Sequence, residues 1–220
     1  MNLGDIDFYL VFDLFILLLI GMGPKIALVP FLELTKEMDG DTQKKVARRM
    51  VQTAVVTALI LVVLGGFLMK LLHFSPGALN IAGGIVLLLL ALHMLVSPGK
   101  EDHHKKASGR DEMKMALYPL AVPYLLNPAG IAVLVITSGD IAASASNSLV
   151  MMVILILLVL VMGALDMAVF TNLDKLSKHL DPSRLAVTEA VFGVLLAALA
   201  VQLMLDGMHE LGIITMLGAH

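Results

Sequence analysis

Two prolines interrupt long apolar stretches of this chain, and the residues beside them are the first candidates for chemistry. Asn127-Pro128 lies near the middle of residues 118–139, and Gly23-Pro24 interrupts residues 17–35. Proline removes a backbone donor and clashes with the preceding turn, so each predicted helix should kink or break there. In hydrocarbon, the freed backbone groups must be buried in protein or face a wet cavity.

A broken membrane helix places half-helix ends near the bilayer centre. The free N–H groups and positive dipole at such an end suit a carboxylate or another anionic group. The alternative is a tolerated proline kink packed by its neighbours, but two interruptions at matching positions favour a site. The predicted substrate-binding residues are Gly23, Pro24, Lys25, Asn127, Pro128, Ala129 and Gly130.

Lys25 is the only lysine or arginine that the sequence places deep inside a predicted span. A charge at the midplane costs at least ~2.5–3.5 kcal/mol, so Lys25 is expected to face the bundle interior and to have a partner. Asp166 and Glu189 are the candidate partners, and the three residues are predicted to serve charge compensation or proton coupling. Two alternatives stay open: Lys25 snorkels to the cytoplasmic surface, and Glu189 is an interfacial carboxylate.

Other polar residues in the spans predict packing rather than chemistry. Asn80, His93 and Gln202 are expected to form hydrogen bonds between helices. The chain has no cysteine, and the His103-His104 pair has no supporting cluster, so no metal site and no cofactor is expected. No zinc-ligand helix, serine–histidine pairing or phosphate-binding loop is found, so the chain is not expected to be an enzyme.

Composition predicts an integral membrane protein. Of the 220 residues, 59% are hydrophobic and 15% are charged, whereas soluble domains average about 25% charged residues. At about 20 residues per span, six segments are predicted: 8–35, 49–72, 76–97, 115–139, 148–172 and 184–207. We therefore expect a single all-α membrane domain over residues 1–220.

The distribution of positive charge predicts the orientation. The connections 36–49, 98–114 and 173–184 contain five, five and three lysines and arginines, whereas Lys70 is the only one in the remaining connections and termini. Positive residues concentrate on the cytoplasmic side. Both termini are therefore expected outside the cytoplasm, with residues 98–114 as the longest cytoplasmic loop.

The two halves of the chain resemble each other. At an offset of 109 residues Gly84 corresponds to Gly193, Asn80 to Glu189 and His93 to Gln202, while Pro24 corresponds to Pro128 at the interruptions. Three spans per half is an odd number, so the second copy must cross the membrane in the opposite sense. The sequence thus predicts inverted repeats over about 8–97 and 115–207, with helices 1 and 4 broken, as in many secondary transporters.

With these features in place, the chain resembles the MarC family of six-span membrane proteins, also described as neutral amino acid transporter-like. The resemblance rests on Gly23-Pro24 through Thr35-Lys36-Glu37-Met38, on Leu79-Asn80-Ile81-Ala82-Gly83-Gly84 running to His93-Met94-Leu95, and on Tyr118-Pro119-Leu120-Ala121-Val122-Pro123 through Ile136-Thr137-Ser138. It implies an inner-membrane, multi-pass protein that moves small neutral amino acids.

The chain departs from the family pattern at both interruptions. The family typically has Asn-Pro at the first, where this chain has Gly23-Pro24 followed by Lys25. The second is typically Gly-Pro-Gly, where this chain has Asn127-Pro128-Ala129. Lys25 beside the break indicates a carboxylate-bearing substrate or an internal ion pair.

These observations together predict a secondary transporter of small solutes, such as neutral amino acids or related metabolites. Alternating access would take place at a midplane site between helices 1 and 4. The expected partners are a small-molecule substrate and the lipid bilayer, without nucleic acid, and the plan is compatible with a homo-oligomer. The rival hypothesis is a non-transporting scaffold or regulator of an envelope complex.

Overall fold

The computed structural model describes residues 8–96, 113–143, 148–173 and 182–215, which contain helices and no strand. Five helical stretches, the first made of α1 and α2 together, are long and apolar enough to cross a membrane. The number is six if the bent pair η2–α6 counts as one span. The expected all-helical membrane fold is confirmed at this level. The elements are α1 (Phe8–Met22), α2 (Pro24–Thr35), α3 (Gly40–Leu72), α4 (Pro76–Val96), η2 (Ala116–Leu125), α6 (Pro128–Ala143), α7 (Ser148–Thr171) and α9 (Pro182–Glu210).

The second span begins earlier than its apolar stretch suggests. Helix α3 starts at Gly40, not near residue 49, because Asp39 caps it. The carboxylate of Asp39 accepts hydrogen bonds from the backbone N–H groups of Asp41 and Thr42 at 3.1 and 3.0 Å, and from the Thr42 hydroxyl at 2.6 Å. The bonds from Thr42 also hold the pKa of Asp39 below its ordinary value. A capped start lets the helix run through a charged turn before it enters the apolar region.

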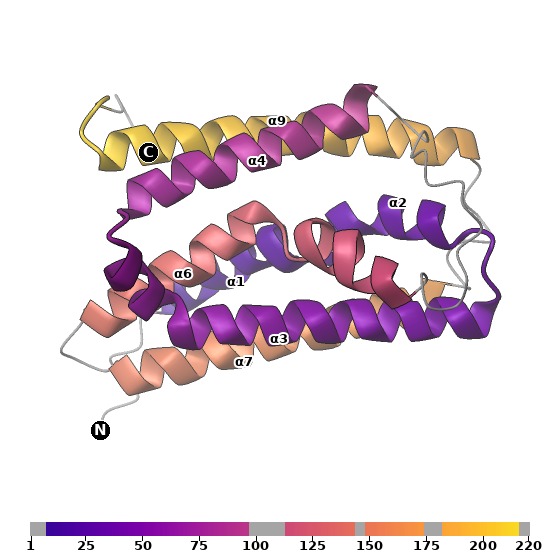
Figure 1. Cartoon of the computed structure of the whole chain (residues 1–220), viewed down its shortest axis with the longest axis horizontal. Coiled ribbons are helices and arrows are strands. Elements are labelled where there is room, and N and C mark those ends of the chain that lie inside the picture. Colours follow the sequence, from indigo (N-terminus) through magenta and orange to yellow (C-terminus); the bar gives the residue numbers. More distant parts are fainter. Residues whose placement is uncertain (1–7, 97–112, 144–147, 174–181, 216–220) are drawn as a thin grey trace.

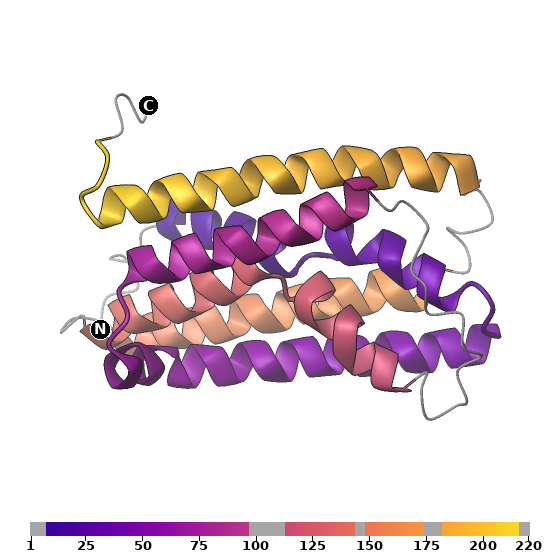
Figure 2. The ribbon, with the colours of Figure 1, turned by 45° about the horizontal axis from the view of Figure 1, so that its top comes forward.

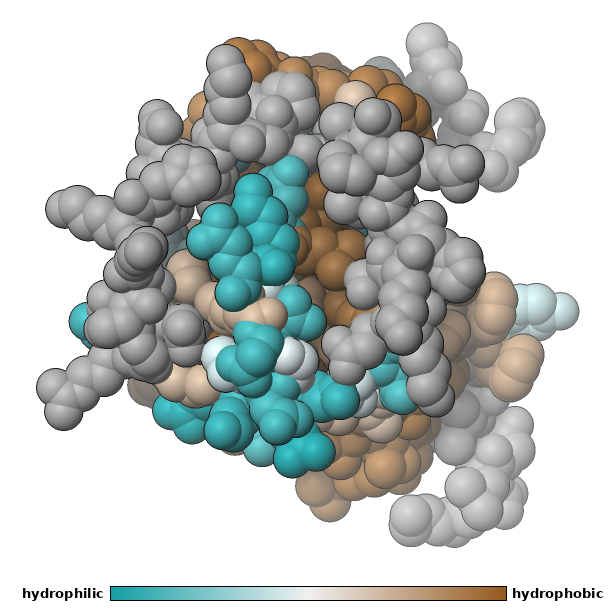
Figure 3. All heavy atoms as spheres, turned by 90° about the vertical axis from the view of Figure 1, so that its right-hand side faces the viewer, coloured by the Kyte–Doolittle hydropathy of each residue, from teal (hydrophilic) through white to brown (hydrophobic). Residues whose placement is uncertain are grey.

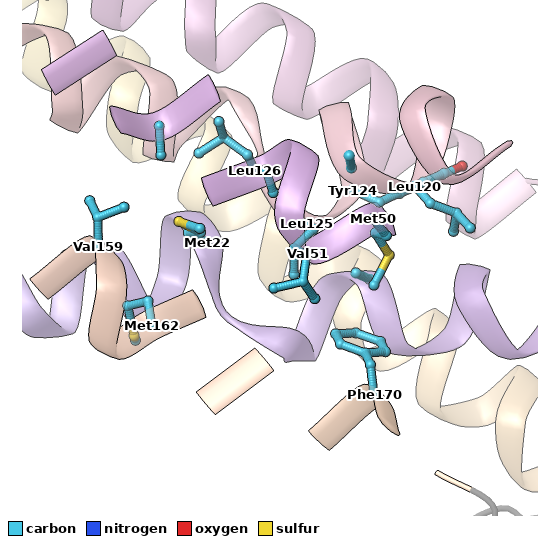
Figure 4. Packing of buried hydrophobic residues seen from close by; sticks show 14 of the residues in the cluster. Met22, Met50, Val51, Leu120, Tyr124, Leu125, Leu126, Val159, Met162 and Phe170 are labelled. Atoms are coloured by element: carbon cyan, nitrogen blue, oxygen red, sulfur yellow. The ribbon is translucent and has the colours of Figure 1, made fainter. Parts of the chain in front are cut away.

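The helices are arranged as a pair laid against a larger group. Helices α4 and α9 lie side by side along one edge, and α1, α2, α3, η2, α6 and α7 form the rest (Figures 1 and 2). The larger group has its own apolar core, part of which is drawn in Figure 4. A second, smaller cluster joins α4 and α9 to the first turns of α2 and α6, through residues that include Leu87, Leu196, Ile26 and Ala129.

Glycines allow α4 and α9 to approach closely. A Cβ atom on Gly77 would lie 2.6 Å from the backbone oxygen of Gly207, and one on Gly84 would lie 2.7 Å from that of Ala200. Small residues at helix contacts are the usual way for membrane helices to gain packing energy, since lipid gives no hydrophobic drive between them. The two helices therefore pack as a tight antiparallel pair.

The outer surface suits a bilayer along its sides and water at its end. Large apolar side chains such as Val56, Ile60, Val63 and Phe67 are exposed on one face of α3. Hydrophilic side chains gather instead at the end of the bundle where α2 stops and α3 starts (Figure 3). Exposed polar residues near this end include Lys36, Glu37, Asp39, Lys45, Arg48 and Arg49.

Gly84→Ala is expected to destabilise the fold, because its Cβ would meet both Met204 and the backbone of Ala200 within 2.7 Å. Overpacking of this kind costs about 1–3 kcal/mol. Thermal unfolding in detergent should show a lowered melting temperature. Gly83→Ala is the matched control, because its Cβ would meet nothing closer than 3.4 Å; equal behaviour of the two variants would contradict the packing described for α4 and α9.

Candidate functional site

The first interruption is a single extended residue between two helices. Helix α1 ends at Met22, Gly23 has φ −82° and ψ 165°, and α2 begins at Pro24. Proline suits the first position of a helix, because its missing N–H would have no partner inside that helix. Gly23 has no side chain with which to cap α2, so the start of α2 has no side-chain hydrogen bond.

The second interruption is a sharp bend. The segment leading into it and α6 are inclined by 70° at Leu126 and Asn127. Helix η2 is itself irregular, with extended backbone at Tyr118 and Val122 and prolines at 119 and 123. The backbone N–H of Leu126 donates to the carbonyl of Ala121 at 2.9 Å, which ends η2.

The two interruptions meet in the middle of the bundle. Gly21 and Gly130 touch through their backbones, and a Cβ atom on either one would overlap the other. Only glycine at both positions permits helices α1 and α6 to cross this closely. The sequence alone does not pair these two glycines. It shows only that a helix can approach the backbone closely at each of them.

Asn127 holds this crossing together with both its backbone and its side chain. Its backbone N–H donates to the carbonyl of Gly21 at 2.9 Å, and its Nδ2 donates to that of Ile20 at 2.8 Å. Its Oδ1 accepts a hydrogen bond from the N–H of Gly130 at 3.0 Å, which caps α6. The last carbonyls of a helix have no partner within the helix, so Asn127 supplies partners for two at the end of α1.

The other residues predicted for substrate binding differ in exposure. Pro128, Ala129 and Gly130 are buried, as is Gly23, while Pro24 is half-buried. Lys25 is exposed, so the expectation that its side chain faces the bundle interior is wrong for this structure. The structure thus brings Asn127 and Gly130 together with Gly21 but leaves the lysine outside the crossing.

Asp166 on α7 is fully buried, with 0% of its surface exposed. Neither carboxylate oxygen has a hydrogen-bond partner among the described residues. The predicted pairing of Lys25 with Asp166 is therefore absent. The side chain of Glu189, the other candidate partner, lies outside the part of the chain that the structure describes.

The three predicted interhelical residues behave differently from one another. Asn80 donates to Glu210 at 3.3 Å and so links α4 to α9. Gln202 donates to Asp206 on its own helix at 2.7 Å, so it forms no link between helices there. His93 is exposed near the end of α4. Within the described ranges, no group of three histidine, aspartate or glutamate side chains could hold a metal ion.

A buried serine that sequence reasoning missed joins α3 to α6. The hydroxyl of Ser138 donates to the carbonyl of Val62 at 2.7 Å and accepts from the N–H of Gly66 at 3.0 Å. A Cβ on Gly65 or Gly66 would crowd the Ser138 turn of α6. The Gly65-Gly66 pair was the available signal, since adjacent glycines in a span mark a close helix contact.

Asn127→Ala is expected to destabilise the protein because the carbonyl of Ile20 and the N–H of Gly130 would both lose their partner. A buried polar group left without a hydrogen bond costs about 1–3 kcal/mol. Denaturant unfolding in detergent micelles should show this loss. Asn172→Ala is the control, since its exposed side-chain amide donates to the carbonyl of Ala168 four residues earlier, at the end of α7; a stability of Asn127→Ala equal to that control would refute the role of Asn127 at the crossing.

Comparison with known proteins identifies relatives along nearly the full chain. A UPF0056 membrane protein of Archaeoglobus fulgidus is 26% identical over 209 residues, covering 94% of this chain and 95% of the relative. One from Methanocaldococcus jannaschii is 27% identical, covering 86% and 90%. The UPF0056 inner membrane protein YhgN of Escherichia coli is 24% identical, covering 88% and 93%. No solved structure matches the chain.

The family described as "MarC family integral membrane protein" matches residues 8–212, which include every described helix. This match extends over both interruptions and over the α4–α9 pair. The chain therefore belongs to the MarC family of multi-pass integral membrane proteins.

Proposed function

We propose that this protein is a secondary transporter of small solutes, of which neutral amino acids or related small metabolites are the leading candidates. The observation that carries the proposal is the meeting of two interrupted spans at Gly21 and Gly130. Irregular backbone at membrane depth is tolerated where protein buries it or where it lines a water-filled cavity. Discontinuous helices of this kind form the central sites of many transporters.

The packing of the two halves supports an inverted-repeat plan. Helices α1 and α2 contact α6 and η2, respectively, α3 contacts α7, and α4 contacts α9. Each span of the first half thus contacts the corresponding span of the second, and α3 also packs against α6 and η2. In alternating access, such halves move against each other around a site between them. We infer that the crossing is closed in this structure, because Pro128, Ala129 and Gly130 are all buried.

The charge distribution supports an orientation with both termini outside the cytoplasm. The hydrophilic end of the bundle in Figure 3 contains the lysine- and arginine-rich start of α3. The opposite end of α3 has Lys70 alone. By the positive-inside rule the hydrophilic end faces the cytoplasm. The relative YhgN is named an inner membrane protein, and we assign the same membrane to this chain.

The substrate class follows from the start of α2. This helix begins inside the bundle without a side-chain cap, so its N-terminal dipole suits an anionic group. Lys25 adds a positive charge in the first turn, and its exposed side chain has no ion-pair partner among the described residues. A small molecule with a carboxylate, such as a neutral amino acid, matches both features.

The rival function is a non-transporting scaffold or regulator of an envelope complex. The observation in its favour is that Asn127 uses its backbone N–H, its Nδ2 and its Oδ1 to hold the crossing itself. Uptake and efflux by purified protein in liposomes separate the two functions. A transporter gives saturable, protein-dependent flux of at least one labelled neutral amino acid or related metabolite, under a proton or sodium gradient or in exchange. Absence of flux for the whole panel would favour the scaffold.

Lys25→Gln is expected to weaken transport of carboxylate-bearing substrates without changing stability. A hydrogen bond to a charged group contributes about 1.5–3 kcal/mol, so the KM should rise about ten- to a hundredfold. Concentration-dependent uptake into liposomes measures this change. Lys36→Gln is the control, because Lys36 is also exposed but lies at the far end of α2. A KM that stays the same in Lys25→Gln would exclude Lys25 from the substrate site.

A further inference from the structure

Asp166 is a buried carboxylate that packing alone does not explain. It is the only titratable residue of α7, its exposed fraction is 0%, and both its oxygens lack a hydrogen-bond partner among the described residues. An ionised carboxylate isolated in an apolar environment is strongly unfavourable, and such a group neutralises or binds a positive ligand. Ionisable groups inside membrane spans mark ion and proton pathways for the same reason.

The position of Asp166 along α7 is set by its neighbours one turn to either side. The ring of Phe170 packs edge-on against Phe31 of α2, with 5.1 Å between ring centroids. In Figure 4, Met162 lies toward the same end of the buried cluster as Met22, the last residue of α1, and Phe170 lies toward the other end. Four residues of helix rise about 6 Å, so Asp166 lies one turn before the contact of Phe170 with Phe31.

This position is level with the first turn of α2, which follows the interruption at Gly23. The chain from Met22 to Phe31 runs alongside α7 in the same direction (Figure 1). Its middle part is Ile26 and Ala27, at the end of the first turn of α2, and the start of that turn has no side-chain cap. The second interruption differs, because Asn127 caps α6 there. A buried carboxylate thus lies level with the first turn of the helix whose start has no side-chain cap.

The charged groups around Asp166 do not neutralise it. Helices α1, α2, α3 and α6 pack against α7. Their titratable residues are exposed, or half-buried in the case of Glu33 and Lys44, and none is within ion-pair distance of Asp166. They are Tyr9 and Asp13 of α1, Lys25 and Glu33 of α2, Asp41, Lys44, Lys45, Arg48, Arg49 and Lys70 of α3, and Asp140 of α6.

The surroundings distinguish a proton from a metal cation. Hard cations take several oxygen ligands, and the described residues contain no group of three acidic or histidine side chains. The buried neighbours one turn away on the same face of α7 are Met162, Gly163 and Phe170, which offer no side-chain oxygen. A single proton is the positive ligand that one carboxylate can hold without further ligands.

We propose that Asp166 binds a proton in this closed state and that its protonation and deprotonation couple proton movement to transport. When the interruption at Gly23 opens to water, the carboxylic O–H bond breaks and the proton passes to water. The carboxylate that remains lies level with the first turn of α2, whose dipole stabilises an anion. The coupling role rests on the transport function proposed above. The binding of a proton to Asp166 does not depend on that function.

The bound proton can be tested without any substrate. Infrared difference spectroscopy of the protein in liposomes at neutral pH should show a protonated carboxyl C=O band. The band should disappear in Asp166→Asn and persist in Asp166→Glu. The control is Asp13→Asn, which removes an exposed carboxylate from α1 and should leave the band in place. A band that survives in Asp166→Asn, or that is absent from the wild type, overturns the proposal.

The coupling is tested by comparing exchange with accumulation. Asp166→Asn should fold and exchange substrate across the membrane, because asparagine matches the shape of a protonated aspartate, but it should lose accumulation driven by a pH gradient. Accumulation equal to wild type, loss of exchange by a folded variant, or wild-type accumulation driven by sodium instead of protons would each overturn the coupling role. If the wild type moves no substrate at all, transport and coupling both fail, and the infrared result still decides whether Asp166 holds a proton.

Discussion

The need to satisfy backbone groups inside the membrane is the constraint on which this structure depends. Two spans stop being regular helices at Gly23 and at Leu126–Asn127, and each stop leaves carbonyl and N–H groups without helical partners. The crossing solves this problem locally, because Asn127 bonds to the end of α1 and to the start of α6. The contact of Gly21 with Gly130 brings those groups within reach.

The two interruptions differ in shape and in capping. The first is a single extended residue and the second is a 70° bend. Asn127 gives α6 a side-chain cap, whereas Gly23 gives α2 none. The first turn of α2 lies level with the buried Asp166 and carries the exposed Lys25. The residues to which we assign chemistry, Lys25 and Asp166, therefore lie in or beside α2. The α6 side serves mainly to hold the crossing in place. From the sequence alone, Asn127 was instead predicted to bind substrate.

Predictions that depend on local sequence agree with the structure, whereas two that depend on helix rotation do not, although Asn80 does link α4 to α9 as expected. The bounds expected for the first, third and fifth spans match the observed helices closely, because proline, glycine and apolar length act over a few residues. Lys25 was expected inside the bundle and is exposed, and Gln202 was expected to bridge helices but bonds within α9. Both errors concern the direction in which a side chain points.

The sequence by itself determined the membrane class, the apolar segments that could span the membrane and the family. Tertiary structure decided which residues meet: Gly21 with Gly130, Asn127 with Ile20, and Asp166 with no partner among the described residues. The physical reason is that lipid and protein core are both apolar. A membrane span therefore carries little pattern to show which face turns inward, and close packing of small residues makes that choice.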